Sequence, residues 1–138
     1  MTARVVVAAP VVAALLAGCG LSLRSQDDFL LTRTGAGKTL TVVVNDGGTI
    51  TCNGSKPRPL AGQLLLQARD LVTNLDADAK EEMNLASTPG SVYRFTMKFQ
   101  DGTISFPDTA GGRHTELGAA EQFALEAAQG PCVDVVGP

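Results

Sequence analysis

The sequence predicts an α+β domain, in which an antiparallel sheet of about five strands carries two helices on one face in the order β-β-β-α-β-β-α. Short runs of β-branched and aromatic residues, separated by turn sequences, indicate the strands. Two longer segments repeat their apolar residues at helical spacing. Because the links between successive strands are short, we expect those strands to pair antiparallel.

Three strands are expected first, as a meander. Residues 29–33 lead into the turn-forming sequence at 35–37, and the β-branched run 40–44 follows it. Residues 45–48 read Asn-Asp-Gly-Gly, a strong hairpin turn, after which residues 49–52 return as the third strand.

A helix is expected next, over residues 59–75, with Pro59 in its first turn. Its apolar residues recur at helical spacing and predict one buried stripe: Leu60, Leu64, Ala68, Leu71 and Leu75. Residues 76–90 begin with four carboxylates and end in Ser-Thr-Pro-Gly, so they are either a short extra helical turn or an acidic loop.

The second half predicts a hairpin and a final helix. Residues 92–99 alternate, which places Tyr93, Phe95, Met97 and Phe99 on one buried face. An Asp-Gly turn connects this strand to a second one at 103–106. After a Gly-rich loop, a helix from about 115 to 129 ends at Gly-Pro. Five of its residues are expected to be buried: Leu117, Ala120, Phe123, Ala124 and Ala127.

The amino terminus has the pattern of a secretory signal. Arg4 precedes an apolar run that ends in the small residues before Cys19, and polar residues arrive too early for a permanent membrane span. The sequence Leu16-Ala17-Gly18-Cys19 resembles the lipobox of bacterial lipoproteins. The resemblance implies cleavage after residue 18 and lipidation of Cys19.

From this we expect a signal peptide at 1–18, a lipidated tether at 19–28 and a single domain at 29–138. The expected location is the extracytoplasmic face of the cell membrane, reached through lipid on Cys19. Two or more acyl chains would give stable anchoring, since each buried CH₂ contributes about 0.8 kcal/mol.

The remaining two cysteines, Cys52 and Cys132, form an even pair in an exported, oxidising context, which predicts a disulfide. A reactive thiol or a metal pair is the alternative. The chain, however, has no CxxC spacing and one histidine.

Charge and composition disfavour nucleic-acid binding. Fourteen acidic residues outnumber eleven basic ones, and the chain has one Tyr and no Trp. Binding to phosphate backbones draws on clustered Lys and Arg, and base stacking draws on aromatic platforms. We therefore expect no nucleic-acid partner.

Several features imitate catalytic motifs. Residues 35–39, Gly-Ala-Gly-Lys-Thr, imitate a phosphate-binding loop but precede a strand rather than a helix. His114 has no partner pattern and is expected on an exposed loop, and no serine has a nucleophile-elbow context. The carboxylates at 76–82 lack the turn glycine of a calcium loop. No metal or cofactor is expected.

The sequence therefore favours a non-enzymatic module that binds an envelope protein or a small ligand. Two alternatives remain open, a protease inhibitor and an enzyme whose residues assemble only in space. The enzyme would gather His114 with acidic residues in one pocket.

The inhibitor alternative rests on a resemblance in element order. The turn at 34–37, the strand start at 92–95 and the Asp-Gly turn at 101–102 are similar in order to emfourin-like inhibitors of thermolysin-type metallopeptidases. The resemblance spans residues 29–128, but the Gly-Gly-Phe-Ala-Gly-like segment of that family is absent. It implies inhibition through a loop such as 35–39.

Overall fold

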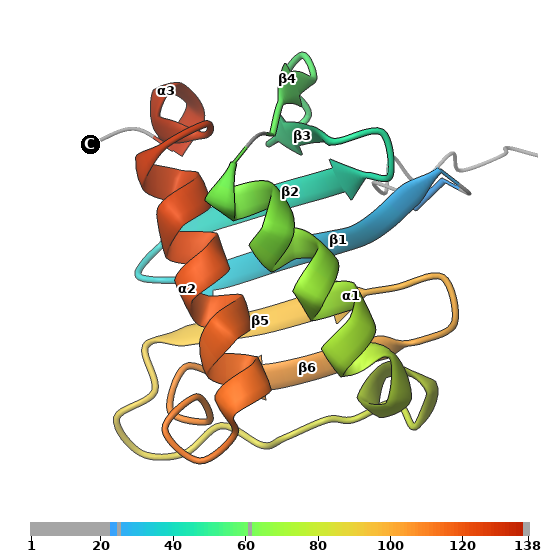
Figure 1. Ribbon diagram of the computed structural model, residues 1–138. Helices are drawn as coiled ribbons and strands as arrows, with labels where there is room; N and C mark the ends of the chain where they lie inside the picture. The colour runs from blue at the N-terminus through green and yellow to red at the C-terminus, as the bar shows by residue number, and fades with distance from the viewer. Residues whose placement is uncertain (1–22, 25, 61, 137–138) are drawn as a thin grey trace, which may run out of the picture.

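Six strands form one antiparallel sheet, and two long helices cover one of its faces (Figure 1). This computed structural model describes residues 23–24, 26–60 and 62–136. The strands are β1 Asp27–Gly35, β2 Lys38–Asn45, β3 Thr49–Cys52, β4 Arg58–Pro59, β5 Tyr93–Lys98 and β6 Thr103–Pro107. The helices are α1 Gln63–Lys80, α2 Thr115–Gln129 and α3 Val133–Val136. The predicted α+β class, with both long helices on one face, is confirmed.

The strand order is β4-β3-β2-β1-β5-β6. The first four strands run outward from β1 as a meander, and α1 then carries the chain back across the sheet. For this reason β5 pairs with the other side of β1, where Arg33 lies opposite Phe95. The β1–β2 hairpin closes through a two-residue turn at Ala36 and Gly37, both with positive φ.

The helix predicted from residue 59 starts later. Pro59 lies in β4, because the Leu60 N–H donates to the Gly48 carbonyl at 2.8 Å and holds this segment extended beside β3. The placement of Pro59 in the first helical turn was therefore wrong. The predicted end was also wrong, since α1 continues to Lys80, where a 2.6 Å ion pair with Asp76 spans one turn.

Residues 83–85 lie along the outer edge of β6. The Leu85 N–H donates to the Ser105 carbonyl at 2.8 Å, and the Ser105 N–H donates to the Met83 carbonyl at 2.9 Å. Of the two alternatives for 76–90, the helical one holds for residues 76–80, which end α1, whereas 83–85 is part of the loop that follows and is bridged parallel to β6 through Asn84 and Ser105. It shields an edge that would otherwise offer unpaired backbone groups.

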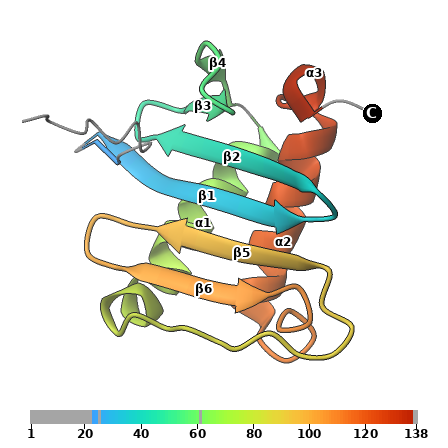
Figure 2. The ribbon, with the colours of Figure 1, turned by 180° about the vertical axis from the view of Figure 1, so that it is seen from behind.

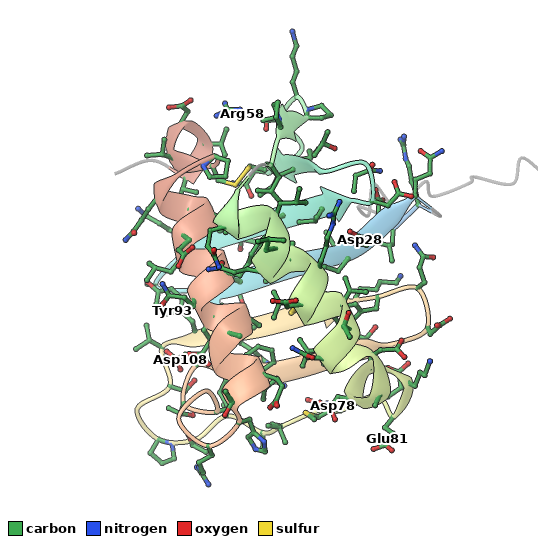
Figure 3. The ribbon with its side chains drawn as sticks, viewed as in Figure 1. Asp28, Arg58, Asp78, Glu81, Tyr93 and Asp108 are labelled. Carbon is green, nitrogen blue, oxygen red and sulfur yellow. A yellow bond between two sulfur atoms is a disulfide. The ribbon has the colours of Figure 1, made fainter. Side chains whose placement is uncertain are left out.

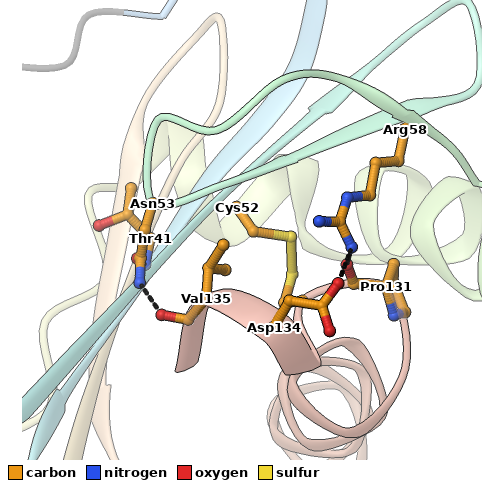
Figure 4. Close-up of a disulfide and its surroundings, with 8 residues drawn as sticks. Thr41, Cys52, Asn53, Arg58, Pro131, Asp134 and Val135 are labelled. Carbon is orange, nitrogen blue, oxygen red and sulfur yellow. Dashed lines mark hydrogen bonds and ion pairs between the residues drawn. A yellow bond between two sulfur atoms is a disulfide. The ribbon is translucent and has the colours of Figure 1, made fainter. Parts of the chain in front are cut away.

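The predicted disulfide is present. Cys52 at the end of β3 is bridged to Cys132 just before α3, with a Cα–Cα separation of 5.5 Å (Figure 4). Arg58 strengthens the same junction, donating to the Pro131 carbonyl at 2.8 Å and contacting Asp134 at 3.2 Å. These contacts hold the short helix α3, which the sequence did not predict, against the β3–β4 end of the sheet.

One apolar core lies between the sheet and the helices. All five predicted inward residues of α2 are buried, as are Phe95, Met97 and Phe99, whereas Tyr93 is only half-buried. The Phe29 ring packs edge-on against Phe123, with ring centroids 5.6 Å apart.

Among the described residues, no helix covers the opposite face of the sheet (Figure 2). A row of hydroxyl residues crosses it, because Thr32 pairs with Thr41 on one side and Thr96 on the other, and Thr96 pairs with Ser105. Successive strand residues point to opposite faces, so these residues alternate with the buried core.

Candidate functional site

A hollow of about 220 Å³ lies at the end of the sheet where the β1–β2 hairpin, the start of β5 and α3 meet. It combines charged, aromatic and apolar side chains. Six of the lining residues are Arg33, Thr39, Leu40, Tyr93, Val135 and Val136. The volume is several times the roughly 30 Å³ that one water molecule occupies, so the hollow has room for a small organic ligand.

Arg33 and Tyr93 form the charged and aromatic part of this hollow. The guanidinium carbon of Arg33 lies 5.1 Å from the centre of the Tyr93 ring, within cation–π range. The register that pairs Tyr93 with Gly35 brings the two side chains together. A Cβ atom at Gly35 would fall 2.2 Å from the Val92 carbonyl oxygen, so this close pairing depends on glycine.

Asp108 fixes the backbone of Tyr93. Its carboxylate accepts the N–H of Tyr93 at 3.0 Å, the N–H of Val92 at 3.1 Å and the hydroxyl of Ser91 at 2.9 Å. Burial raises the pKa of Asp108, but these hydrogen bonds outweigh it and hold the pKa below its ordinary value. Figure 3 shows Tyr93 and Asp108 at the same end of the sheet.

The edge of β2 forms another wall of the hollow. Asn53 ends the pairing between β2 and β3, since its N–H donates to the Thr41 carbonyl and its side-chain oxygen accepts the Thr41 N–H, both at 2.7 Å. Its amide nitrogen also donates to the Val135 carbonyl at 3.3 Å, which draws α3 toward β2 (Figure 4). In an antiparallel strand, backbone groups alternate between neighbours, so Thr39 directs its N–H and C=O to the same side as Thr41.

His114 lines a second hollow, of about 190 Å³, in front of the first turn of α2. Its neighbours there include Arg113 and the hydrogen-bonded pair Thr88 and Thr109, whose hydroxyls are 2.6 Å apart. No carboxylate is among the described residues that line this hollow. The histidine is exposed, and its side chain does not cap the helix.

A third hollow, of about 290 Å³, lies at the opposite end of the sheet and is acidic. Five carboxylates line it: Asp27, Asp28, Asp46, Asp76 and Asp101. Burial, followed by the charge of Asp46, raises the pKa of Asp28. Within the described part of the chain, no group of three histidine, cysteine or acidic side chains is placed to hold a metal ion.

The residues predicted from sequence have different outcomes. Cys52 and Cys132 are joined, as predicted, whereas Cys19 and the signal segment lie outside the described residues. In the ranges 23–24, 26–60 and 62–136, no helix is both long and apolar enough to cross a bilayer.

The Arg33–Tyr93 hollow was not predicted. Its two central residues lie sixty positions apart in the sequence, and only the β1–β5 pairing joins them. The one sequence signal was the break in alternation at Arg33, a charged residue on the face of β1 that also carries Phe29 and Leu31.

Comparison with known proteins adds no relationship. No protein family, curated protein or solved structure matches this chain. The resemblances to lipoproteins and to emfourin-like inhibitors therefore stay predictions.

Proposed function

We propose that this protein is a lipid-anchored lipoprotein on the extracytoplasmic face of a bacterial membrane, and that its domain is a non-enzymatic binding module. The observation that carries the anchor is the cysteine pattern. Cys52 and Cys132 are buried and bridged, which supports an oxidising compartment. Cys19 is the cysteine left over, and it ends a lipobox-like sequence.

The length of the tether limits where the domain works. β1 begins at Asp27, eight positions after Cys19. Fully extended, eight residues span at most about 28 Å. The acidic end of the sheet, where β1 starts, is therefore the end held nearest the membrane.

The binding role is supported by the described hollows. The residues around His114 provide an arginine and two threonines but no carboxylate that would orient the imidazole as a base. The Arg33–Tyr93 hollow instead combines two basic residues, Arg33 and Lys38, with one aromatic ring and an apolar wall, a lining typical of a small-ligand site.

The anchor is tested by Cys19→Ser in cells, followed by fractionation. We expect the wild-type protein in the membrane fraction. We expect the variant either as uncleaved precursor or as protein that has been released from the membrane. In the variant, the bridge between Cys52 and Cys132 stays intact on non-reducing gels.

The matched control replaces both bridged cysteines, Cys52→Ser with Cys132→Ser. This variant is expected to keep its lipid while losing the bridge. Equal lipid labelling of the wild type and the Cys19→Ser variant would refute the anchor.

A further inference from the structure

We propose that the Arg33–Tyr93 hollow is a carboxylate-binding site, whose ligand is an acid with a small apolar substituent next to the carboxylate. A peptide C-terminus and a free acylated branched-chain amino acid both carry this chemistry. The inference rests on the proposed binding role, whereas it is independent of the lipid anchor.

Arg33 differs from the other half-buried arginines in the described part of the chain. Arg58 donates to the Pro131 carbonyl and pairs with Asp134. Arg94 donates to the Leu85 carbonyl, to Ser87 and to Asn84. The guanidinium groups of these two arginines therefore donate hydrogen bonds to other residues of the fold.

Arg33 has the Tyr93 ring on one side and no described carboxylate in ion-pair contact. A guanidinium carries five N–H donors in a planar fork, and the face of an aromatic ring leaves the donors at its edge available. This fork matches the two oxygens of a carboxylate, and partial burial makes a pairing stronger than it would be in water. The ligand that complements this site is therefore an anion.

The other residues of the hollow determine which substituent next to the carboxylate is favoured. Leu40, Val135 and Val136 provide an apolar wall beside the guanidinium. A bare inorganic anion gains nothing from such a wall, whereas a small aliphatic side chain buries surface there at about 25 cal/mol per Å².

The edge of β2 adds a directional contact. The N–H and C=O of Thr39 face the side of β2 where the β3 pairing has ended at Asn53. An amide group next to the bound carboxylate would pair with this edge as an added strand residue does. An acylated amino acid therefore fits the hollow better than a simple fatty acid.

The experiment is a titration of the full chain, purified in a mild detergent and followed by amide NMR shifts. The probes are N-acetyl-valine and its amide, N-acetyl-valinamide, which has the same shape without the charge. We expect saturable shifts around Thr39, Tyr93 and Val135 with the acid, and affinity at least about tenfold weaker with the amide. Equal affinity for the acid and the amide would overturn the proposal.

Two variants test the role of the guanidinium. We expect Arg33→Gln to weaken acid binding about tenfold or more, and Arg33→Lys to weaken it severalfold, since lysine keeps the charge but loses the fork. The matched control is Arg113→Gln, which removes the same charge beside the other hollow and should leave the affinity within twofold. Unchanged affinity in Arg33→Lys and Arg33→Gln would overturn the proposal, and the lysine variant keeps the test valid if the glutamine variant does not fold.

Further probes separate the sources of the acid. A Gly-Gly-Val tripeptide that binds at least tenfold more tightly than N-acetyl-valine identifies a peptide C-terminus, and equal affinity identifies a free acylated amino acid. If inorganic phosphate binds with the same affinity as either acid, the apolar wall does not favour an aliphatic side chain, and this part of the proposal is contradicted. A negative result in all titrations would remove the carboxylate site while leaving the membrane anchoring, which is measured by fractionation, intact.

Discussion

The two faces of the sheet use alternate residues of the same strands, yet they have opposite chemistry. The covered face carries Phe29, Leu31 and Val42, all without exposure to solvent. The open face carries a row of hydroxyls through Thr32 and Thr96. The difference teaches that stability is concentrated on one face, while the other needs only residues that favour strands and tolerate water.

The covered face changes character at one end. Arg33 belongs to it by register, two residues beyond Leu31, but it is half-buried and its guanidinium lies over the ring of Tyr93, which is the partner of Gly35. The hollow therefore forms at the end of the sheet where the buried apolar residues of this face stop. The proposed binding site is thus adjacent to the apolar core, on the same face of the sheet.

The largest expected effect concerns the bridge that joins the covered face to the end of α2. Cys52→Ala with Cys132→Ala opens a loop with a sequence separation of 80. The loop-entropy relation predicts a loss of about 4.5 kcal/mol in the free energy of unfolding, measured by urea denaturation. A loss below about 1 kcal/mol would show that the bridge contributes little, and Cys19→Ser serves as the control that keeps it.

The next effect compares the two faces directly. Phe29→Ala removes a ring packed against Phe99 and Phe123, and we expect a loss of about 3–5 kcal/mol in unfolding free energy. Thr32→Ala, three residues along β1 on the open face, should cost about 0.5 kcal/mol or less. Similar losses in the two variants would show that both faces are packed.

A smaller effect than that of Phe29→Ala concerns the loop after β6, which fixes Tyr93 beside Arg33. Asp108→Asn replaces a carboxylate that accepts three hydrogen bonds, and we expect it to lower the unfolding free energy at pH 7 by about 1–2 kcal/mol. Because the folded pKa of Asp108 lies below its ordinary value of 3.8, its contribution is present above that value and is lost as the pH falls through the folded pKa.

The gap between wild type and Asp108→Asn should therefore close in acid, as measured by urea denaturation from pH 7 to pH 2. Glu121 acts in the opposite direction. Burial raises its folded pKa above 4.5, so its contribution is present below 4.5 and is lost as the pH rises through the folded pKa. Glu121→Gln is the matched control, and a gap that persists unchanged at pH 2 would show that the Asp108 charge is not the cause.

Local sequence patterns were sufficient for most of the fold. The alternation after Val92 predicted a strand with one buried face, and the apolar repeat around Phe123 predicted a helix with one buried side. The structure confirms both elements. The start of α1 was missed because the pairing of Pro59 with Thr49 depends on a strand ten residues earlier. Helix α3 was missed because four residues are too short to show a period.

Less of the candidate site than of the fold could be predicted from the sequence. A disulfide can be predicted by counting cysteines, but the meeting of Arg33 and Tyr93 follows from the order of the strands. That order is decided by α1 crossing the sheet, and neither residue belongs to a motif. The signal that remained was a single charge on an otherwise apolar strand face.

The central claim is that Cys19 carries lipid while Cys52 and Cys132 are joined. Intact-mass analysis of the membrane-extracted protein, with and without reduction, tests both parts at once. We predict a chain that begins at Cys19, has the added mass of two or more acyl chains, and gains the mass of two hydrogens on reduction. A mature chain without acyl mass on Cys19, or one with free thiols at Cys52 and Cys132 before reduction, would contradict it.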